Sequence, residues 1–513
     1  MNLNNFFYRT TLFLVFINIF RTLSGLISQI VIAASFGASA PLDAYLVTFS
    51  LPQIFGDFLL GGVMFFVLIP MFMEYKSKQD EESAWELILN ITNIFNLILF
   101  IVMLGYVFLA PFWIRLLAPG FSLETSATAI IITRIIFPLF ILMSMVWITS
   151  ALLNSYNNFL IPALSAVVPP LTIVFFVLIF RRQWGIYSLA GGILIGSLIQ
   201  LLMQWFALPV KRYRFSISIT EGVKKSLYLA VPIFATVIVY NLVAVYQRFL
   251  ASKLAVGNIS ALNFANYVIN AFLSILCIPL VTVIFPFLSS QALEGNNLNF
   301  KNTCAKGIKL INFISLPLTM YLVIFYYPLT KIIFNRGNFG TQDVHLTSSA
   351  LLFLSIGFFA FSGITLLSRV FYSLKDMTTP LYLSSIVLIS SLPLNYFLCK
   401  LFGIKGLALA TSIATTIIYI AFLYALNRKI GVLKNRGMII SFIKTLVVAI
   451  LAVLSAAALF NYFLKCGIFN LTANFFIATI FSVILFILLA FIAGISEIGD
   501  FLPLFLKRRS DLS

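Results

Sequence analysis

The sequence predicts an all-α polytopic membrane protein with fourteen transmembrane helices. Of its 513 residues, 61% are hydrophobic and only 9% are charged, whereas a typical soluble domain carries about 25% charged residues. The apolar residues gather in runs of about 20 or more, the length at which a helix crosses the hydrocarbon core of a bilayer. The basic residues lie mostly in the short gaps between these runs, which is typical of the loops of a multi-pass protein.

Fourteen apolar runs account for nearly the whole chain. Several are longer than a straight helix needs to cross the bilayer, which indicates tilted or bent helices, and five prolines inside long runs predict kinks because proline removes a backbone donor. These prolines are Pro52, Pro70, Pro138, Pro279 and Pro286. The predicted spans are residues 10–36, 43–73, 86–114, 125–153, 160–180, 185–210, 222–252, 258–290, 303–330, 345–374, 379–399, 404–427, 438–463 and 472–495.

The loop charges predict the orientation. An even number of spans places both termini on one side, and most of the lysines and arginines outside the spans fall on that side. The positive-inside rule therefore predicts cytoplasmic termini. The excess of 33 Lys+Arg over 15 Asp+Glu follows from this topology, so it does not indicate a nucleic-acid-binding protein.

The cysteine and histidine content argues against a metal site. The four cysteines (Cys277, Cys304, Cys399 and Cys466) form no CxxC pair, and His345 is the single histidine, so a Cys/His ligand set is not expected. No catalytic triad is visible either, and we expect a transporter and no enzyme. Because Arg21 interrupts the first apolar run and no small-residue cleavage site follows, that run is interpreted as a retained helix, not a signal peptide.

Two halves of the chain repeat each other. The stretch "LNSYNNFLIP" ends at Pro162, and its counterpart "FYSLKDMTTP" ends at Pro380. The stretches "GIYSLAGG" and "GIKGLALA" begin at Gly185 and Gly403, which are separated by the same offset as the two prolines. The stretches "VLIPMF" and "TVIFPF" follow the same order at nearly the same offset. Three matches at nearly one offset indicate an internal duplication.

The duplication predicts the domain organisation. Each repeat holds six spans, and an even number gives both halves the same orientation, so they are parallel repeats with a substrate site expected between them. We expect an N-terminal bundle at 1–212, a second bundle at 213–430, and two added helices with a basic tail at 431–513. Long kinked spans in two like halves favour alternating access over a fixed channel; a scaffold is the other alternative.

Several stretches resemble the MurJ/MviN family of proposed lipid II flippases, in the MOP exporter superfamily. The resemblance rests on "FGASAPLDAYLVTFSLPQIF", "IPMFMEYKSK" and "ASKLAVGNISALNFANYV", and above all on "NRGNFGTQDVHLTSSALLFLSIGFFAFSGITLLSRVFYSLKDMTTPL". The last stretch carries the family's Arg336-Gly337-x-Phe339, Asp343, Gly357, Arg369-x-Phe371-Tyr372, Asp376 and Thr379-Pro380. The resemblance also implies fourteen helices, with the last two flanking a groove for a lipid tail.

The resemblance implies a flippase that moves a polyprenyl-diphosphate-linked cell-wall precursor of the lipid II type across the bacterial cytoplasmic membrane. A cationic cavity would hold the diphosphate, since arginine forms bidentate, charge-assisted hydrogen bonds with phosphate. No cofactor is implied, although ions or the membrane potential are expected to bias the cycle. The expected partners are the lipid-linked glycan, membrane lipids and the cell-wall synthesis machinery.

The charged set differs from the family pattern and leaves an alternative cargo open. The family's second arginine and acid in the first helix fall at Ser28 and Gln29, and its A-D-R in the eighth falls at Ala265-Asn266-Tyr267. An arginine pair in the second helix gives way to Gly56-Asp57. The alternative is another lipid-linked oligosaccharide, such as an exopolysaccharide, capsule or O-antigen precursor, or a cationic small molecule.

Arg21 is the leading candidate for contact with the cargo. A charge inside a membrane helix costs roughly 2.5–3.5 kcal/mol even on insertion scales, so it indicates either an anion contact in a wet cavity or a buried ion pair, with Asp57 as the expected partner. Asp57 could also couple transport to a cation or proton.

A further set of polar residues is expected to line the same cavity. Intramembrane polar residues face the protein interior, although each could instead join helices or reach the interface. This set is Arg134, Arg248, Gln29, Gln53, Asn266 and Asn270. Asp43 and Asp376 are expected to act as gate or structural residues. For Asp43 the alternatives are that it holds a gate, caps a helix N-terminus or touches the substrate.

Overall fold

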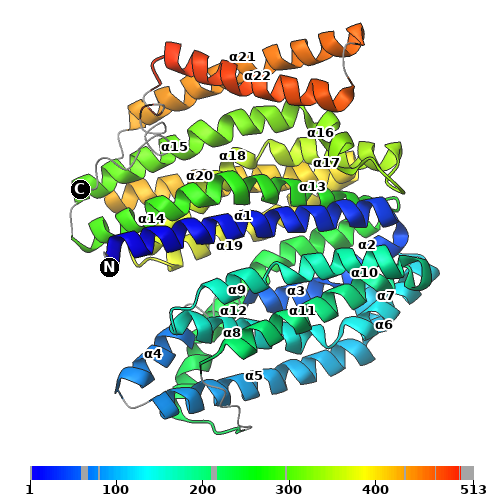
Figure 1. Ribbon diagram of the computed structural model, residues 1–513, viewed down its shortest axis with the longest axis vertical. Helices are drawn as coiled ribbons and strands as arrows, with labels where there is room; N and C mark the ends of the chain where they lie inside the picture. The colour runs from blue at the N-terminus through cyan, green and yellow to red at the C-terminus, as the bar shows by residue number, and fades with distance from the viewer. Residues whose placement is uncertain are drawn as a thin grey trace. The chain divides into compact units, whose positions relative to one another are not determined.

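The computed structural model describes residues 3–58, 68–78, 81–209, 216–294, 297–431, 435–467 and 470–495, together with 497 and 499. Throughout these ranges the regular elements are helices and no strand occurs, as expected where the bilayer core offers backbone groups no water. The helices (Figure 1) are α1 (Leu3–Phe36), α2 (Ala40–Thr48), α3 (Ser50–Phe58), α4 (Ile69–Lys78), α5 (Glu81–Phe108), α6 (Ala110–Leu117), α7 (Leu123–Ile136), α8 (Leu139–Ser155), α9 (Leu160–Ser165), α10 (Val168–Trp184), α11 (Tyr187–Ala207), α12 (Glu221–Ser252), α13 (Asn258–Phe272), α14 (Ile278–Leu293), α15 (Asn297–Ile324), α16 (Tyr326–Phe334), α17 (Thr341–Ser355), α18 (Phe358–Ser373), α19 (Thr378–Phe402), α20 (Ile404–Ile430), α21 (Asn435–Cys466) and α22 (Leu471–Ile492).

The all-α membrane fold is confirmed. In the described part of the chain, ten helices are long and apolar enough to cross a membrane, or twelve if each of two bent helix pairs forms one span. Two predicted spans are not among these twelve. Residues 59–67 of the span 43–73 lie outside the described part, and the span 222–252 forms the continuous helix α12. The count of fourteen therefore stays a prediction.

Both bent pairs have an identifiable cause. α7 and α8 meet at an angle of 43° where Pro138 stands as the N-cap of α8, so the kink predicted at this proline is confirmed. α17 and α18 meet at 51° at Gly357. The hydroxyl of Ser412 on α20 donates to the carbonyls of Phe353 and Leu354 and accepts from the Gly357 amide. Ser412 thus satisfies backbone groups that the bend releases.

Three of the other predicted prolines lie within a helix or in its first turn. Pro52 lies in the first turn of α3, just after α2 ends. Pro279 lies in the first turn of α14 after a π-helical turn at Leu273–Cys277, and Pro286 lies within α14. α13, the π-helical turn and α14 together still form one span of 36 residues. A π-helical turn absorbs the lost hydrogen bond without breaking the helix.

The backbone supports the internal duplication. Gly185 separates α10 from α11 with φ 53° and ψ −131°, and Gly403 separates α19 from α20 with φ 58° and ψ −131°. Asn157 and Lys375 stand at the same offset from each other as these glycines. Both have φ 58°, and they are the two non-glycine residues of the described chain with positive φ. Such a conformation is uncommon outside glycine, so its recurrence at one offset indicates a shared ancestral turn.

The chain forms two compact units. The first holds residues 1–260 together with 336–340, and the second holds 261–335 and 341–513. The first unit includes α12, and Arg248 on this helix is hydrogen-bonded to Ser50 and Gln53 on α3. The expected segments 1–212, 213–430 and 431–513 follow sequence repeats instead, and they stay a prediction.

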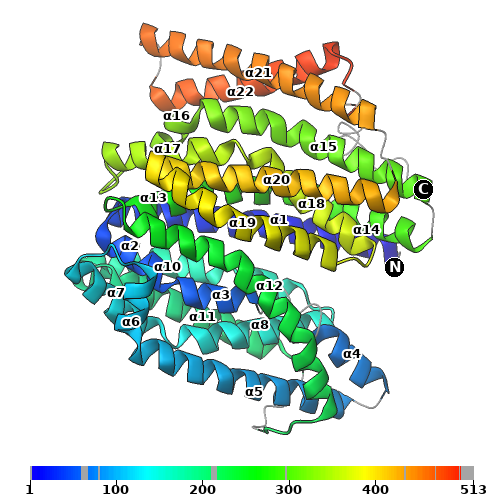
Figure 2. The ribbon, with the colours of Figure 1, turned by 180° about the vertical axis from the view of Figure 1, so that it is seen from behind.

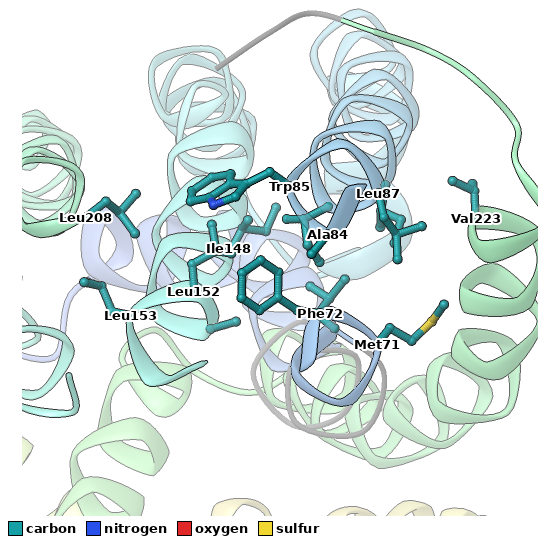
Figure 3. Close-up of a cluster of buried hydrophobic side chains, with 14 residues drawn as sticks. Met71, Phe72, Ala84, Trp85, Leu87, Ile148, Leu152, Leu153, Leu208 and Val223 are labelled. Atoms are coloured by element: carbon teal, nitrogen blue, oxygen red, sulfur yellow. The ribbon is translucent and has the colours of Figure 1, made fainter. Parts of the chain in front are cut away.

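A buried apolar cluster organises one end of the first unit (Figure 3). Phe72 on α4 meets Trp85 on α5 edge-to-face, with ring centroids 6.2 Å apart. Ile148 and Leu152 on α8 pack into the same cluster, which also takes in Leu208 and Val223. The cluster fixes α4, α5 and α8 against one another, and α8 carries residues of the site described below.

In the second unit, α21 and α22 pack side by side, and α21 also packs on α15 (Figures 1 and 2). Glu497, which is 2% exposed, joins α15 to α21. It lies 3.7 Å from the ammonium of Lys309 on α15 and accepts a hydrogen bond at 2.7 Å from Ser441 on α21. Lys444 on α21 donates to the carbonyl of Ala493 at the end of α22.

Candidate functional site

Arg21 lines a cavity within the first unit. The cavity has a volume of about 350 Å³. Its wall comes from α1, α4, α8, α9, α11 and the segments beside α9, and the residues are Ile17, Asn18, Arg21, Ile69, Trp147, Ser150, Ala151, Asn154, Phe159, Pro162, Ala163, Ala166 and Gln200. The Arg21 guanidinium donates to the side-chain oxygen of Asn18 at 3.1 Å, one helical turn earlier on the same face.

The cavity carries a positive charge. Of the residues that line it, Arg21 is charged and none is a carboxylate, and the partner of Arg21 is the neutral amide of Asn18. The ion pair expected with Asp57 stays a prediction, because the Asp57 side chain lies outside the described residues. A cation in a cavity of low polarity attracts anions strongly, so the chemistry of this cavity favours an anionic ligand.

A buried hydrogen-bond network supports the cavity wall. The amide oxygen of Gln204 on α11 accepts from Thr149 at 2.6 Å and from Ser150 at 3.0 Å, both on α8. The amide nitrogen of Gln204 donates to Ser165 on α9 at 2.9 Å. Gln204 is fully buried, so its hydrogen bonds hold three helices together. Because Ser150 also lines the cavity, the network fixes the position of one cavity hydroxyl.

Trp147 adds a buried donor to the same wall. Its indole nitrogen is buried and has no hydrogen-bond partner among the described residues. A buried polar group without a partner is uncommon and costs free energy. Together with Asn154 and Gln200, Trp147 gives the Arg21 cavity polar groups that a sugar or phosphate could engage.

The cavity residues around Arg21 were not predicted from the sequence. Asn18 stands one turn before Arg21, and Gln200 and Gln204 stand one turn apart within a predicted span. Polar residues repeated at helical spacing inside an apolar run were the available signal. The sequence does not show which helices adjoin, so it could not connect Gln204 with Ser150 on another helix.

The other predicted cavity residues lie apart from Arg21. Arg248 donates to Ser50, and to Gln53 at 3.2 Å, so Arg248 and Gln53 join α12 to α3. Arg134 is exposed on α7, and Gln29 is half-buried on α1. Neither lines the Arg21 cavity, and contact of these four residues with cargo stays a prediction.

Asn266 and Asn270 use their amides within α13. The Asn266 side chain donates to the carbonyl of Leu262 at 2.9 Å, and that of Asn270 donates to the carbonyl of Asn266 at the same distance. A side-chain amide bonded in this way can still accept through its oxygen. A role in binding sugar hydroxyls is compatible with this geometry and stays a prediction.

Asp43 holds the start of another helix. Its carboxylate accepts from the backbone amides of Gly257 and Ser260, each at 2.8 Å, and from the Ser260 hydroxyl. Asp43 is 4% exposed. Asp43 therefore caps the N-terminus of α13, a helix that belongs to the second repeat; a gating role stays a prediction.

Asp376 caps the first turn of α19. It accepts from the Thr379 amide at 3.0 Å and from the hydroxyls of Thr378 and Thr379 at 3.1 and 2.6 Å. Lys429 at the end of α20 donates to the same carboxylate. Burial acts to raise the pKa of Asp376, but Lys429 and the threonine donors lower this pKa well below its usual range. Asp376 is therefore charged and structural.

The loop at 336–340 caps the end of α1. The amide of Asn338 donates to the carbonyl of Ala34, and its side chain donates to the carbonyl of Ser35, both at 2.8 Å. Gly337 has φ 60°, and a Cβ there would lie 2.2 Å from the Ala34 oxygen. This contact gives a physical reason for the "NRGNFG" stretch, since glycine alone fits this approach.

The second unit holds an apolar cavity of about 460 Å³. Its residues come from α15, α18, α20 and α21 and are mostly apolar: Ile308, Asn312, Phe359, Thr416, Tyr419, Ile420, Leu423, Asn427, Met438, Ile439 and Phe442. α21 lines it and α22 contributes none of these residues. A cavity of this composition fits a hydrocarbon chain.

Comparisons with known proteins agree with this architecture. Residues 32–477 match the family model described as "Lipid II flippase MurJ". A probable lipid II flippase MurJ of Buchnera aphidicola subsp. Schizaphis graminum is 29% identical over 448 residues, covering 86% of this chain and 87% of the relative. The lipid II flippase MurJ of Burkholderia cenocepacia is 26% identical over 406 residues, covering 76% and 78%.

Solved structures show the same fold. A lipid II flippase MurJ in an inward closed conformation superposes with a TM-score of 0.82 at 23% identity, covering 94% of this chain and 98% of that one. An inward-facing multidrug resistance MATE family transporter of the MOP superfamily gives 0.68 at 16% identity, covering 81% and 96%. The family match spans most of the chain, and the protein belongs to the MurJ lipid II flippase family.

Proposed function

We propose that this protein is a flippase that moves lipid II, a polyprenyl-diphosphate-linked cell-wall precursor, across the bacterial cytoplasmic membrane. The observation that carries the proposal is the positively charged Arg21 cavity in a chain that matches the MurJ family over residues 32–477. No bond of the cargo is made or broken in this process, so the protein acts as a transporter and not as an enzyme.

The chemistry of the first unit suits the headgroup of such a lipid. The Arg21 guanidinium would bind the diphosphate, because arginine presents a planar fork of donors that matches phosphate oxygens. Ser150, Asn154 and Gln200 offer hydroxyl and amide groups to the sugars. A cationic cargo would be repelled by Arg21, since the lining residues include no carboxylate. The cavity therefore favours an anionic headgroup.

The chemistry of the second unit suits the tail. The apolar cavity bordered by α21 would hold part of the polyprenyl chain, while the remainder stays in lipid. The headgroup would pass from one side to the other by alternating access of the two halves. Ions or the membrane potential would bias this cycle, and both termini would lie in the cytoplasm. The cell-wall synthesis machinery would supply and consume the lipid.

A rescue experiment tests the function. The full-length protein is expressed in bacteria depleted of their own lipid II flippase, and growth is followed together with the protein's level in the membrane. We expect growth to be restored. Failure of a well-expressed, membrane-inserted protein to restore growth, while a MurJ from another bacterium succeeds in the same strain, would contradict the proposal.

A further inference from the structure

A groove in the second unit shares no lining residue with either cavity described above. It runs between the N-terminal end of α19 and the C-terminal end of α20 and has a volume of about 460 Å³. Thr378, Thr379, Tyr382 and Leu383 of α19 and Ala421, Tyr424, Ala425 and Arg428 of α20 line it. Ala421 and Ala425 stand one helical turn apart, so the groove exists because these positions lack large side chains.

One end of the groove is positively charged. The guanidinium of Arg428 lies 4.9 Å from the centre of the Tyr424 ring, and no described carboxylate lies within ion-pair distance of it. The carboxylate of Asp376 nearby is already paired with Lys429 and hydrogen-bonded to Thr378 and Thr379. The donors of Arg428 are therefore not occupied by any carboxylate of the described residues.

The other end continues into exposed apolar surface. Tyr382 is 68% exposed, and Ile386 and Ile389 follow it at helical spacing along α19 with 48% and 51% exposure. On α20, Ile417 is 47% exposed and lies two helical turns from Tyr424 in the same direction. An exposed apolar strip of this kind on a membrane helix contacts acyl chains. Tyrosines at its charged end are typical of the membrane–water interface.

We propose that this groove binds one anionic phospholipid of the surrounding membrane. Its phosphate is held by Arg428, its headgroup lies between Tyr382 and Tyr424, and its acyl chains run along the isoleucines of α19 and α20. The charge at one end selects an anionic over a zwitterionic lipid, because arginine binds phosphate by charge-assisted hydrogen bonds and basic side chains near a membrane surface attract anionic lipids. This binding is separate from cargo transport.

The first repeat carries different residues at three of the groove positions. When the repeats are aligned by Gly185 and Gly403, Tyr382, Ala421 and Tyr424 correspond to Leu164, Met203 and Phe206. The first repeat thus has no hydroxyl at two of the positions and a larger side chain at the third. The phospholipid site is therefore a property of the second repeat.

Native mass spectrometry of the delipidated full-length protein tests the proposal. The protein is titrated with dioleoyl-phosphatidylglycerol or dioleoyl-phosphatidylcholine, and the dissociation constant of the first bound lipid is measured. We expect phosphatidylglycerol to bind more tightly than phosphatidylcholine. Arg428→Ala should weaken phosphatidylglycerol binding about tenfold, as loss of a charge-assisted contact does, and leave phosphatidylcholine binding unchanged.

Two further variants serve as controls. One changes the shape of the groove without changing its charge, and the other removes an arginine outside the groove. Ala421→Met fills the groove with the side chain of the first repeat and should weaken phosphatidylglycerol binding while Arg428 is intact. Arg182→Ala removes an exposed arginine at the end of α10 and should change nothing. Equal losses for Arg182→Ala and Arg428→Ala, or unchanged binding in Ala421→Met, would overturn the proposal. The proposal would also be overturned if a polyprenyl diphosphate displaced phosphatidylglycerol at a concentration below that of the phospholipid, because the groove would then bind cargo.

Discussion

The buried carboxylate of Asp43 accepts a hydrogen bond at 2.8 Å from the backbone amide of Ser260, a residue of the second repeat. The same carboxylate accepts from the Gly257 amide and the Ser260 hydroxyl. One side chain on α2 thus satisfies the free amides that begin α13. This contact joins an early helix of the first repeat to a helix of the second.

Asp43→Asn should destabilise the protein. The neutral amide keeps one acceptor oxygen and places its own N–H₂ group against backbone donors, leaving at least one buried amide unpaired at a cost of about 1–3 kcal/mol. Thermal unfolding of the purified protein in detergent should show a lower midpoint. Glu124→Gln, at an exposed position in the first turn of α7, is the matched control, and an equal shift in both variants would contradict this assignment.

Gly337→Ala should release the 336–340 loop from α1. The residue has φ 60°, and its new Cβ would lie 2.2 Å from the Ala34 oxygen, so the loop must move and the hydrogen bonds of Asn338 must lengthen. Limited proteolysis should cleave the loop faster in this variant than in the wild type. Gly340→Ala provides the control, because a Cβ there meets no atom within 4 Å. Indistinguishable cleavage of the two variants would exclude the proposed tight contact.

The pairing of Asp376 with Lys429 predicts a specific pH dependence. Because the folded-state pKa of Asp376 is lowered below its ordinary value of 3.8, the pair stabilises the protein fully above that value and is lost as the pH falls below it. Unfolding midpoints of the wild type and Asp376→Asn should therefore differ by a constant amount between pH 5 and pH 7. A difference that shrinks as the pH falls from 7 to 5 would show that the carboxyl titrates within this window, above its ordinary pKa, and would contradict the lowered pKa.

The same pair should show coupling in a double-mutant cycle. Lys429 is 42% exposed, so solvent screens it and the coupling between Asp376→Asn and Lys429→Met should be about 0.5–1 kcal/mol. Strictly additive effects on the free energy of unfolding would show that the threonine donors alone hold the carboxylate.

Gln204→Leu should impair the cavity without removing a residue that lines it. The substitution leaves Thr149, Ser150 and Ser165 without their shared partner, so Ser150 is free to rotate away from the cavity wall. We expect weaker binding of lipid II by the purified protein, with the helix content measured by circular dichroism unchanged. Asn395→Leu, which replaces a buried amide of α19 outside the cavity, is the comparison; an equal loss of binding there would indicate a general effect on packing.

The sequence was sufficient to predict the class of the fold and its duplication. Apolar runs of membrane-spanning length leave helices as the available structure, and the offset between Gly185 and Gly403 appears again as matched backbone angles. Proline predicted the bend at residue 138 correctly. The equally sharp bend at Gly357 was not predicted, because it depends on the hydroxyl of Ser412 in another helix.

The site was predictable only in part, for a related reason. Arg21 stood out because a charge in an apolar run has a known cost. Its neighbours Trp147, Ser150 and Gln200 carry no such signal, since neutral polar residues also join helices. Arg248 carried the same signal as Arg21, yet it binds two side chains of α3 in the first unit. Whether such an arginine lines a cavity or binds a neighbouring helix depends on which helices pack beside it. A single sequence does not show which helices are neighbours.

The central claim is that Arg21 holds the anionic headgroup of the cargo. The measurement that tests it most directly is the amount of lipid II exposed on the outer face of bacteria depleted of their own flippase and expressing this protein at matched levels. We expect the wild type to restore exposure and Arg21→Ala to abolish it. Arg21→Lys should retain less exposure than Arg369→Lys, which alters an exposed arginine packed on Phe285. Full exposure in cells that carry Arg21→Ala would contradict the account.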